Sequence, residues 1–183
     1  MRKNWRRMLV VFGENIKVRK RILQLIDGLT DEEFNGTPSC GGWSPKQIVE
    51  HLALMECRVA TNIAKELKNP DSPRVFKKPI GVSASPLIKA YLLECTEPTD
   101  TYLSISETQE RLHQSRNFLL DIYDSATEEE FRSKSIKHPI FGNVPLIQWF
   151  RFVGFHEKRH LRQLKRAVDL AKSNTAPLYE SSK

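Results

Sequence analysis

A seam of core positions, spaced three and four residues apart, runs through the last third of the chain and constrains the fold most strongly. It consists of Leu146, Trp149, Val153, His156, His160, Gln163, Ala167 and Leu170. This spacing is typical of a helix that packs one side into a bundle core. Two histidines and a glutamine occupy consecutive core positions, where a polar group without a partner costs about 1–3 kcal/mol. The seam predicts a long helix whose buried polar groups serve a shared purpose.

The histidines of this seam have the spacing of metal ligands. His156 and His160 are one helical turn apart, so both imidazoles project from one face and can reach one ion. His51, far upstream, borders the apolar stripe of its own helix between Ile48 and Met55. Three neutral imidazoles leave coordination positions open, as in catalytic metal sites. A single histidine at any of these positions would more often be a satisfied core residue or a residue of the helix surface, but the three together predict one shared divalent metal.

Four long segments with helical spacing predict an all-α fold, a four-helix bundle. They cover approximately residues 11–29, 44–67, from 104 or 106 onward, and 145–172. The second has a clear start, because Ser44 can cap, Pro45 suits the first helical position and Gln47 completes a capping box. Thr30 and Thr127 begin similar Thr-x-x-Glu sequences after the first and third helices, an internal echo that capping alone also explains.

The connection between the second and third helices sets the expected topology. Residues 68–103 contain five prolines, and we expect a short helix at 87–93 within them. A connection this long can cross the bundle, so that the third helix lies parallel to the second. The predicted course is therefore up-down-down-up. Residues 135–144, with Pro139 and Gly142, are expected to form a loop or a short extended ribbon.

Length and composition indicate one ordinary globular domain. The chain has 183 residues, 39% hydrophobic and 28% charged, which is enough for a substantial core. We expect the bundle to span residues 1–172 and a disordered tail at 173–183. No apolar run approaches the roughly 20 residues of a membrane span, and none suits a secretory signal. Three cysteines without Cys-x-x-Cys spacing argue against a disulfide scaffold, so we expect a cytoplasmic protein without a membrane partner.

The net charge of +7 raises the question of a nucleic-acid partner. Basic residues gather at 2–21 and at 158–166. Neither region interleaves aromatic side chains with the charges, and no nucleic-acid motif is present, so we expect no such partner. Arg162, Lys165, Arg166 and Asp169 fit a solvated helix face. A basic rim around a site for an anionic substrate is an equally consistent interpretation.

The chain resembles the DinB/YfiT-like superfamily over roughly residues 10–172. The residues that carry this resemblance are Trp43-Ser44-x-x-Gln47-Ile48-x-x-His51-Leu52, His138-Pro139-x-Phe141-Gly142, Trp149, and His156-Glu157-x-x-His160-x-x-Gln163. The resemblance implies an up-down-down-up four-helix bundle and a divalent metal, often zinc or nickel, on His51, His156 and His160. Some members are S-transferases of the low-molecular-weight thiols bacillithiol, mycothiol or glutathione. Others are thiol-dependent isomerases, and many have no established reaction.

Three functions are compatible with these residues. The first is a metal-dependent transferase, in which the metal holds and deprotonates a low-molecular-weight thiol that attacks a small-molecule substrate. Gln163, one turn beyond His160, and Glu157 are then candidates for orienting a ligand or the substrate. The second is a hydrolase, since His156-Glu157-x-x-His160 matches the zinc-protease motif, with Glu157 as general base and Glu180 as a third ligand.

The protease form of the second hypothesis conflicts with the expected fold. Such proteases hold their substrate on a sheet, and Glu180 falls in the expected tail. A hydrolase with His51 as third ligand and a metal-bound hydroxide remains open. The third function is non-catalytic, a metal-binding or purely structural dimer. Phe118 and Leu120 are candidate interface side chains, although core packing is the default interpretation for both.

Overall fold

The computed structural model describes residues 5–81 and 96–175, and four long helices dominate them. The elements in chain order are α1 (Trp5–Ile26), α2 (Asp31–Asn35), α3 (Pro45–Leu67), α4 (Ile105–Ser125), α5 (Glu128–Ser133), β1 (Ser135–His138), β2 (Gly142–Pro145) and α6 (Leu146–Thr175). The predicted all-α bundle is confirmed. Among the described residues, no helix combines the length and the apolar character that a membrane span requires.

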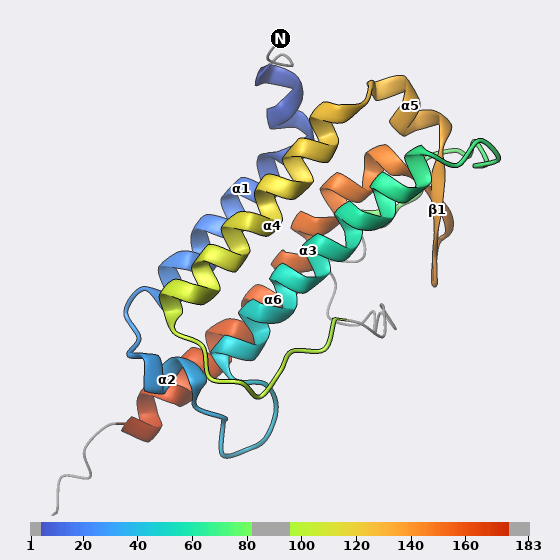
Figure 1. The fold of residues 1–183 in the computed structure, drawn as a ribbon. Coiled ribbons are helices and arrows are strands. Elements are labelled where there is room, and N and C mark those ends of the chain that lie inside the picture. Colours follow the sequence, from blue (N-terminus) through green and yellow to red (C-terminus); the bar gives the residue numbers. More distant parts are fainter. Residues whose placement is uncertain (1–4, 82–95, 176–183) are drawn as a thin grey trace, which may run out of the picture.

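The course of the chain is the predicted up-down-down-up. In Figure 1, α1 and α6 run from the upper end of the bundle to the lower end, while α3 and α4 run the opposite way. Helix α1 packs mainly against α6, α3 packs against α4, and α6 also contacts α3. The short helix expected at 87–93 lies outside the described residues. The parallel arrangement of α3 and α4 is the feature that requires the long connection between them.

Capping boxes begin four of the helices. The backbone N–H of Gln47 donates to Ser44 Oγ, and the N–H of Ser44 donates to Gln47 Oε1 at 2.9 Å. Of the two serines considered for the third long helix, Ser104 is the cap. Thr30 and Thr127 also cap, so the internal echo marks the starts of the short helices α2 and α5. The capping contacts of Ser44 fix the residue at which α3 begins, and therefore the place of His51 along this helix.

The bounds of two long helices differ from the sequence expectation. Helix α1 begins at Trp5 and ends at Ile26, because the extended backbone of the Thr30 cap already belongs to the next helix. Helix α6 continues to Thr175, so the start of the expected tail is helical, and residues 176–183 lie outside the described part. Residues 135–145 form an antiparallel hairpin that pairs His138 with Gly142, which is the short extended ribbon considered for this segment. Gly142 has a φ of 65°, a conformation that glycine adopts without strain.

The core consists of two apolar clusters, one toward each end of the bundle. The first includes Phe12, Phe131, Phe150 and Val153, and the second includes Ile22, Ile48 and Leu164. On α6 the first cluster ends at Val153 and the second begins at Leu164, so the two histidines of this helix lie between the clusters. The two histidines of the predicted seam therefore form a buried layer between the clusters, whereas Gln163, expected at a core position, is exposed.

Candidate metal centre

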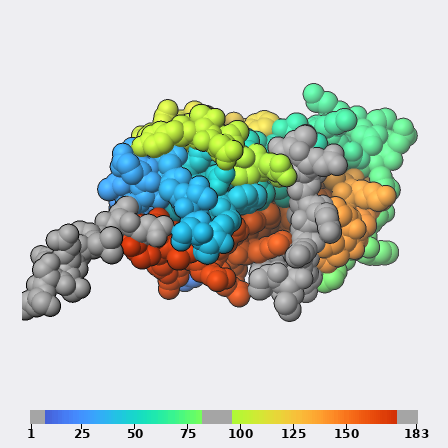
Figure 2. Space-filling view, turned by 90° about the horizontal axis from the view of Figure 1, so that it is seen from below, coloured from blue at the N-terminus to red at the C-terminus, as the bar shows by residue number. Residues whose placement is uncertain are grey.

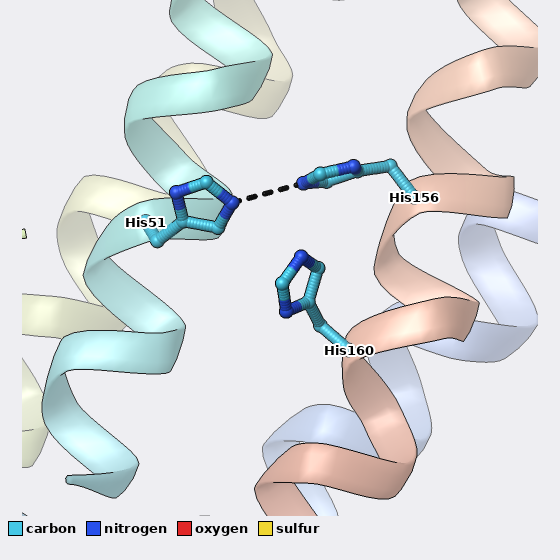
Figure 3. A group of neighbouring side chains, drawn as sticks. All are labelled: His51, His156 and His160. Atoms are coloured by element: carbon cyan, nitrogen blue, oxygen red, sulfur yellow. Dashed lines mark hydrogen bonds between the residues drawn. The ribbon is translucent and has the colours of Figure 1, made fainter. Parts of the chain in front are cut away.

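The three predicted histidines meet in this layer. His51 extends from α3, and His156 and His160 extend from α6, toward a common gap (Figure 3). One ring nitrogen from each residue lies within 4.8 Å of the other two, and the Nε2 atoms of His51 and His156 are 3.1 Å apart. Small rotations of the imidazoles suffice to place such nitrogens about 2.0–2.1 Å from one ion. The donor set fits a borderline divalent metal such as zinc or nickel.

Two of the imidazoles are oriented by oxygen acceptors. His51 Nδ1 lies 2.7 Å from the carbonyl oxygen of Thr96, and His160 Nδ1 lies 2.8 Å from Oε1 of Gln163. Because a carbonyl oxygen only accepts, each Nδ1 carries the proton and donates it. Each Nε2 then has its lone pair directed into the gap. This is the arrangement in which an outer hydrogen bond prepares a histidine for a metal.

Burial keeps the three imidazoles neutral. Burial lowers the pKa of His51, lowers that of His156 well below its usual value, and lowers that of His160 to about 4. The positive charge of Arg159 acts in the same direction on all three. A neutral imidazole is the form that binds a metal, so no proton has to be displaced near neutral pH.

Trp43 forms one wall of the site, a position that was not predicted from the sequence. Its ring centroid is 4.9 Å from that of His51 and 6.4 Å from that of His160, with the latter pair nearly parallel at 14°. The position directly before the Ser44 cap was the available signal, because that cap begins the helix that carries His51. The segment that ends at Trp43, residues 38–43, lies beside α6 (light blue and red in Figure 2).

A cavity of about 630 Å³ lies between residues 38–43 and α6. His160 and Gln163 contribute to its lining, together with Trp43. His160 belongs both to the histidine group and to the lining of this cavity. The cavity therefore gives a small molecule room beside the candidate metal position. The sequence contained no recognisable substrate pocket, because its walls come from segments more than a hundred residues apart.

The structure does not bring Glu157 to the histidines. Its Oε1 accepts a hydrogen bond from Arg19 Nε at 2.8 Å and one from Arg116 Nη2 at 3.2 Å. Both arginines also contact Glu56, whose Oε2 accepts from Ser115 Oγ at 2.6 Å. A residue directly after His156 is rotated by about 100° around the helix, which turns it toward α1 and α4. The carboxylate therefore belongs to a buried ion-pair network between helices.

This network explains opposite pKa shifts of its two carboxyls. Burial raises the pKa of Glu157, whose second oxygen has no hydrogen-bond partner among the described residues. Burial also acts to raise the pKa of Glu56, but Arg19, Arg116 and Ser115 outweigh it and lower that pKa. A carboxylate engaged by two arginines is poorly placed to accept a proton from a metal-bound water. The geometry thus argues against the protease hypothesis, and Glu180 lies outside the described residues.

His138 belongs to the hairpin and is not part of the histidine group. Its ring packs among Phe141, Trp149 and Phe152 with centroid distances of 4.8–5.7 Å. Its Nδ1 accepts a hydrogen bond from the backbone N–H of Ile140 at 3.1 Å, which helps to close the turn. The His-Pro-x-Phe-Gly sequence therefore has a structural explanation.

Comparisons with known proteins agree with this fold and site. The family model of the DinB superfamily matches residues 15–164, a range that includes all three histidines. The uncharacterized protein YuaE of Bacillus subtilis (strain 168) is 30% identical over 140 residues, which are 76% of this chain and 86% of that protein. No solved structure matches the chain.

Proposed function

Because the chain belongs to the DinB superfamily and carries a buried triad of neutral histidines, we propose that it is a divalent-metal-dependent enzyme that conjugates a low-molecular-weight thiol with an electrophilic small molecule. The observation that carries this proposal is the convergence of His51, His156 and His160 beside a cavity. A divalent ion at this place, zinc or nickel by the nature of the ligands, supplies open coordination positions and lowers the pKa of a thiol that enters.

The chain itself orients the ligands and covers part of the site. Thr96 and Gln163 hold two of the imidazoles by hydrogen bonds. Trp43 covers the histidines on the cavity side. In the proposed reaction the thiol loses its proton to solvent and its sulfur forms a bond to the electrophilic carbon. With an alkyl chloride as the probe, chloride leaves with the electron pair of the broken carbon–chlorine bond.

The test uses the full chain, stripped of metal and reloaded with zinc or with nickel. Conjugation of cysteine, glutathione and bacillithiol to a fluorogenic alkyl chloride is measured for the native protein and for His160→Ala. We expect His160→Ala to lose the metal-dependent rate. His113→Ala, which removes an exposed histidine of α4, is the matched control and should retain it. A helical spectrum and a melting curve of each variant separate loss of the site from loss of the fold.

The outcome of this assay also decides between the proposed functions. A metal-loaded protein that hydrolyses esters but conjugates no thiol would favour the hydrolase with a metal-bound water. A protein that binds metal tightly but turns over neither class would favour the non-catalytic alternative. Equal conjugation rates of His160→Ala and the native protein would contradict the proposal directly.

A homodimer is part of the proposal. Of the two side chains expected at its interface, Leu120 packs against the core, whereas Phe118 on α4 is 37% exposed. Phe118 is thus the one available to a second copy. Light scattering after size-exclusion chromatography should give twice the mass of the chain for the native protein and less for Phe118→Glu. A native protein that elutes as a monomer at all concentrations would contradict this point.

A further inference from the structure

Three arginines line the cavity beside His160. Arg159, Arg162 and Arg166 occur at intervals of three and four residues, so they follow one stripe along α6. Among residues 5–81 and 96–175, no acidic side chain lines this cavity, and none of the three arginines forms an ion pair. This positive stripe is therefore available for an anion that comes from solution.

The wall opposite the arginines leaves space for a ligand. Gly41 and Gly42 have φ values of 82° and 100°, and an added Cβ at either would meet no atom within 4 Å. Besides the arginines, the polar side chains of the lining are His160 and Gln163, and the apolar ones include Trp43 and Leu170. The cavity thus offers guanidinium donors along α6 and an uncrowded glycine segment opposite them.

We propose that this cavity, which we call the arginine pocket (Arg159, Arg162, Arg166 and the facing residues 38–43), binds a carboxylate or phosphate group of the molecule whose reacting end lies at His160. Guanidinium groups bind both oxyanions through paired, charge-assisted hydrogen bonds. Arg162 and Arg166 lie roughly 3 Å and 9 Å beyond His160 along the helix axis. The preferred ligand therefore carries its anionic group several bonds from its reacting atom.

The positive charge nearest the histidines has a related effect. Arg159 is half-buried, and its charge acts on all three imidazoles. The charge of Arg159 repels a cationic molecule from the histidines and attracts an anionic one. The arginine pocket thus selects by charge before any reaction begins. The assignment of a reacting end at His160 rests on the proposed function, but the binding of an oxyanion at the arginines does not.

The first experiment tests the arginine pocket without metal. Inorganic phosphate and glutarate are titrated by calorimetry into the metal-free full chain and into Arg162→Gln, Arg166→Gln and the double variant. Lys165→Gln is the matched control, because it removes one charge from an exposed position of the same helix outside this cavity. We expect about tenfold weaker binding in the double variant, as lost charge-assisted hydrogen bonds imply. Lys165→Gln should stay within about twofold of the native protein.

The two anions distinguish the source of the ligand chemistry. Tighter binding of phosphate would indicate a phosphate-bearing substrate, and tighter binding of glutarate would indicate a carboxylate. Either result, if lost in the double variant, supports the arginine pocket. Native affinity in the double variant would overturn it. An equal loss of affinity in Lys165→Gln would also overturn it, because the loss would then reflect net charge alone.

The second experiment connects the arginine pocket to the histidines. Zinc-loaded protein is titrated with 6-mercaptohexanoate and with 6-mercaptohexanol, which differ only in the terminal group. The Arg162→Gln, Arg166→Gln double variant should bind the acid about tenfold more weakly and the alcohol unchanged, with the same zinc content. An equal effect on both ligands would contradict the inference. If the native protein takes up no zinc but the double variant still binds phosphate more weakly than the native protein does, the proposed function is wrong and the arginine pocket is supported.

Discussion

The amide oxygen of Gln163 lies 2.8 Å from Nδ1 of His160, one turn earlier on the same helix. This contact fixes the proton on Nδ1 and turns Nε2 toward His51 and His156. The side chain of Gln163 is itself exposed, so the contact serves the imidazole more than the core. The histidine cluster is thus held by partners outside it, as functional sites commonly are.

Removing this partner should weaken metal binding without unfolding the chain. For Gln163→Ala we expect a zinc dissociation constant about 10–100-fold higher, because the imidazole loses its fixed tautomer and orientation. Competition with a chromophoric chelator measures the constant. Gln163→Glu keeps an acceptor at the same place and should retain most of the affinity. Gln114→Ala, at an exposed position of α4, should change nothing. An unchanged constant in Gln163→Ala would show that the contact is incidental.

Glu157→Gln should affect stability rather than the metal site. The substitution removes a charge that faces Arg19 and Arg116 in the buried network, so we expect a loss of on the order of 2–4 kcal/mol in the free energy of unfolding. Urea denaturation measures this loss, and zinc content should stay at the native level. A variant of native stability that loses a peptidase activity would instead revive the general-base role of Glu157.

Gly154 allows α1 to approach α6 closely. An added Cβ would clash with the side chain of Asn15 and would lie 3.0 Å from its backbone nitrogen. Asn15 in turn donates to the carbonyl oxygen of Phe150 at 2.8 Å. We expect Gly154→Ala to lower the free energy of unfolding by about 1–3 kcal/mol.

The matched control for this substitution is Gly13→Ala on α1, where an added Cβ meets nothing within 4 Å. It should be neutral or stabilise by up to about 1 kcal/mol, since alanine favours a helix. Both variants are compared by urea denaturation. Equal stabilities of the two variants would contradict the close approach of α1 and α6.

The buried histidines predict a pH dependence of the metal-free protein. Burial lowers the pKa of His160 from 6.5 to about 4, so the unfolded chain binds more protons than the folded one between these values. The free energy of unfolding should therefore fall as the pH decreases from 6.5 toward 4, by up to about 1.4 kcal/mol per unit for this histidine. In His160→Gln the slope should be shallower. Parallel slopes in the two proteins would contradict the neutral, buried state of this side chain.

Local signals allowed much of the fold to be predicted, because they depend on neighbouring residues. The Ser44 cap, the parallel course of α3 and α4 and the pairing of His156 with His160 follow from spacing along the chain. The contacts of Trp43 and Glu157 do not, since each depends on how one helix is turned toward another. Glu157 shows the limit most clearly. The His-Glu-x-x-His motif predicted that Glu157 lies with the histidines. Because Glu157 directly follows His156, it projects from another side of α6 and contacts Arg19.

The most direct measurement of the central claim is the affinity and stoichiometry of zinc in the full chain, determined by elemental analysis and chelator competition. We expect one ion per chain in the native protein and in His113→Ala. The variants His51→Ala, His156→Ala and His160→Ala should each bind zinc at least about a hundredfold more weakly while their helical spectra stay native. Native zinc affinity in any of these three variants, or no zinc uptake by the folded native protein, would contradict the central claim.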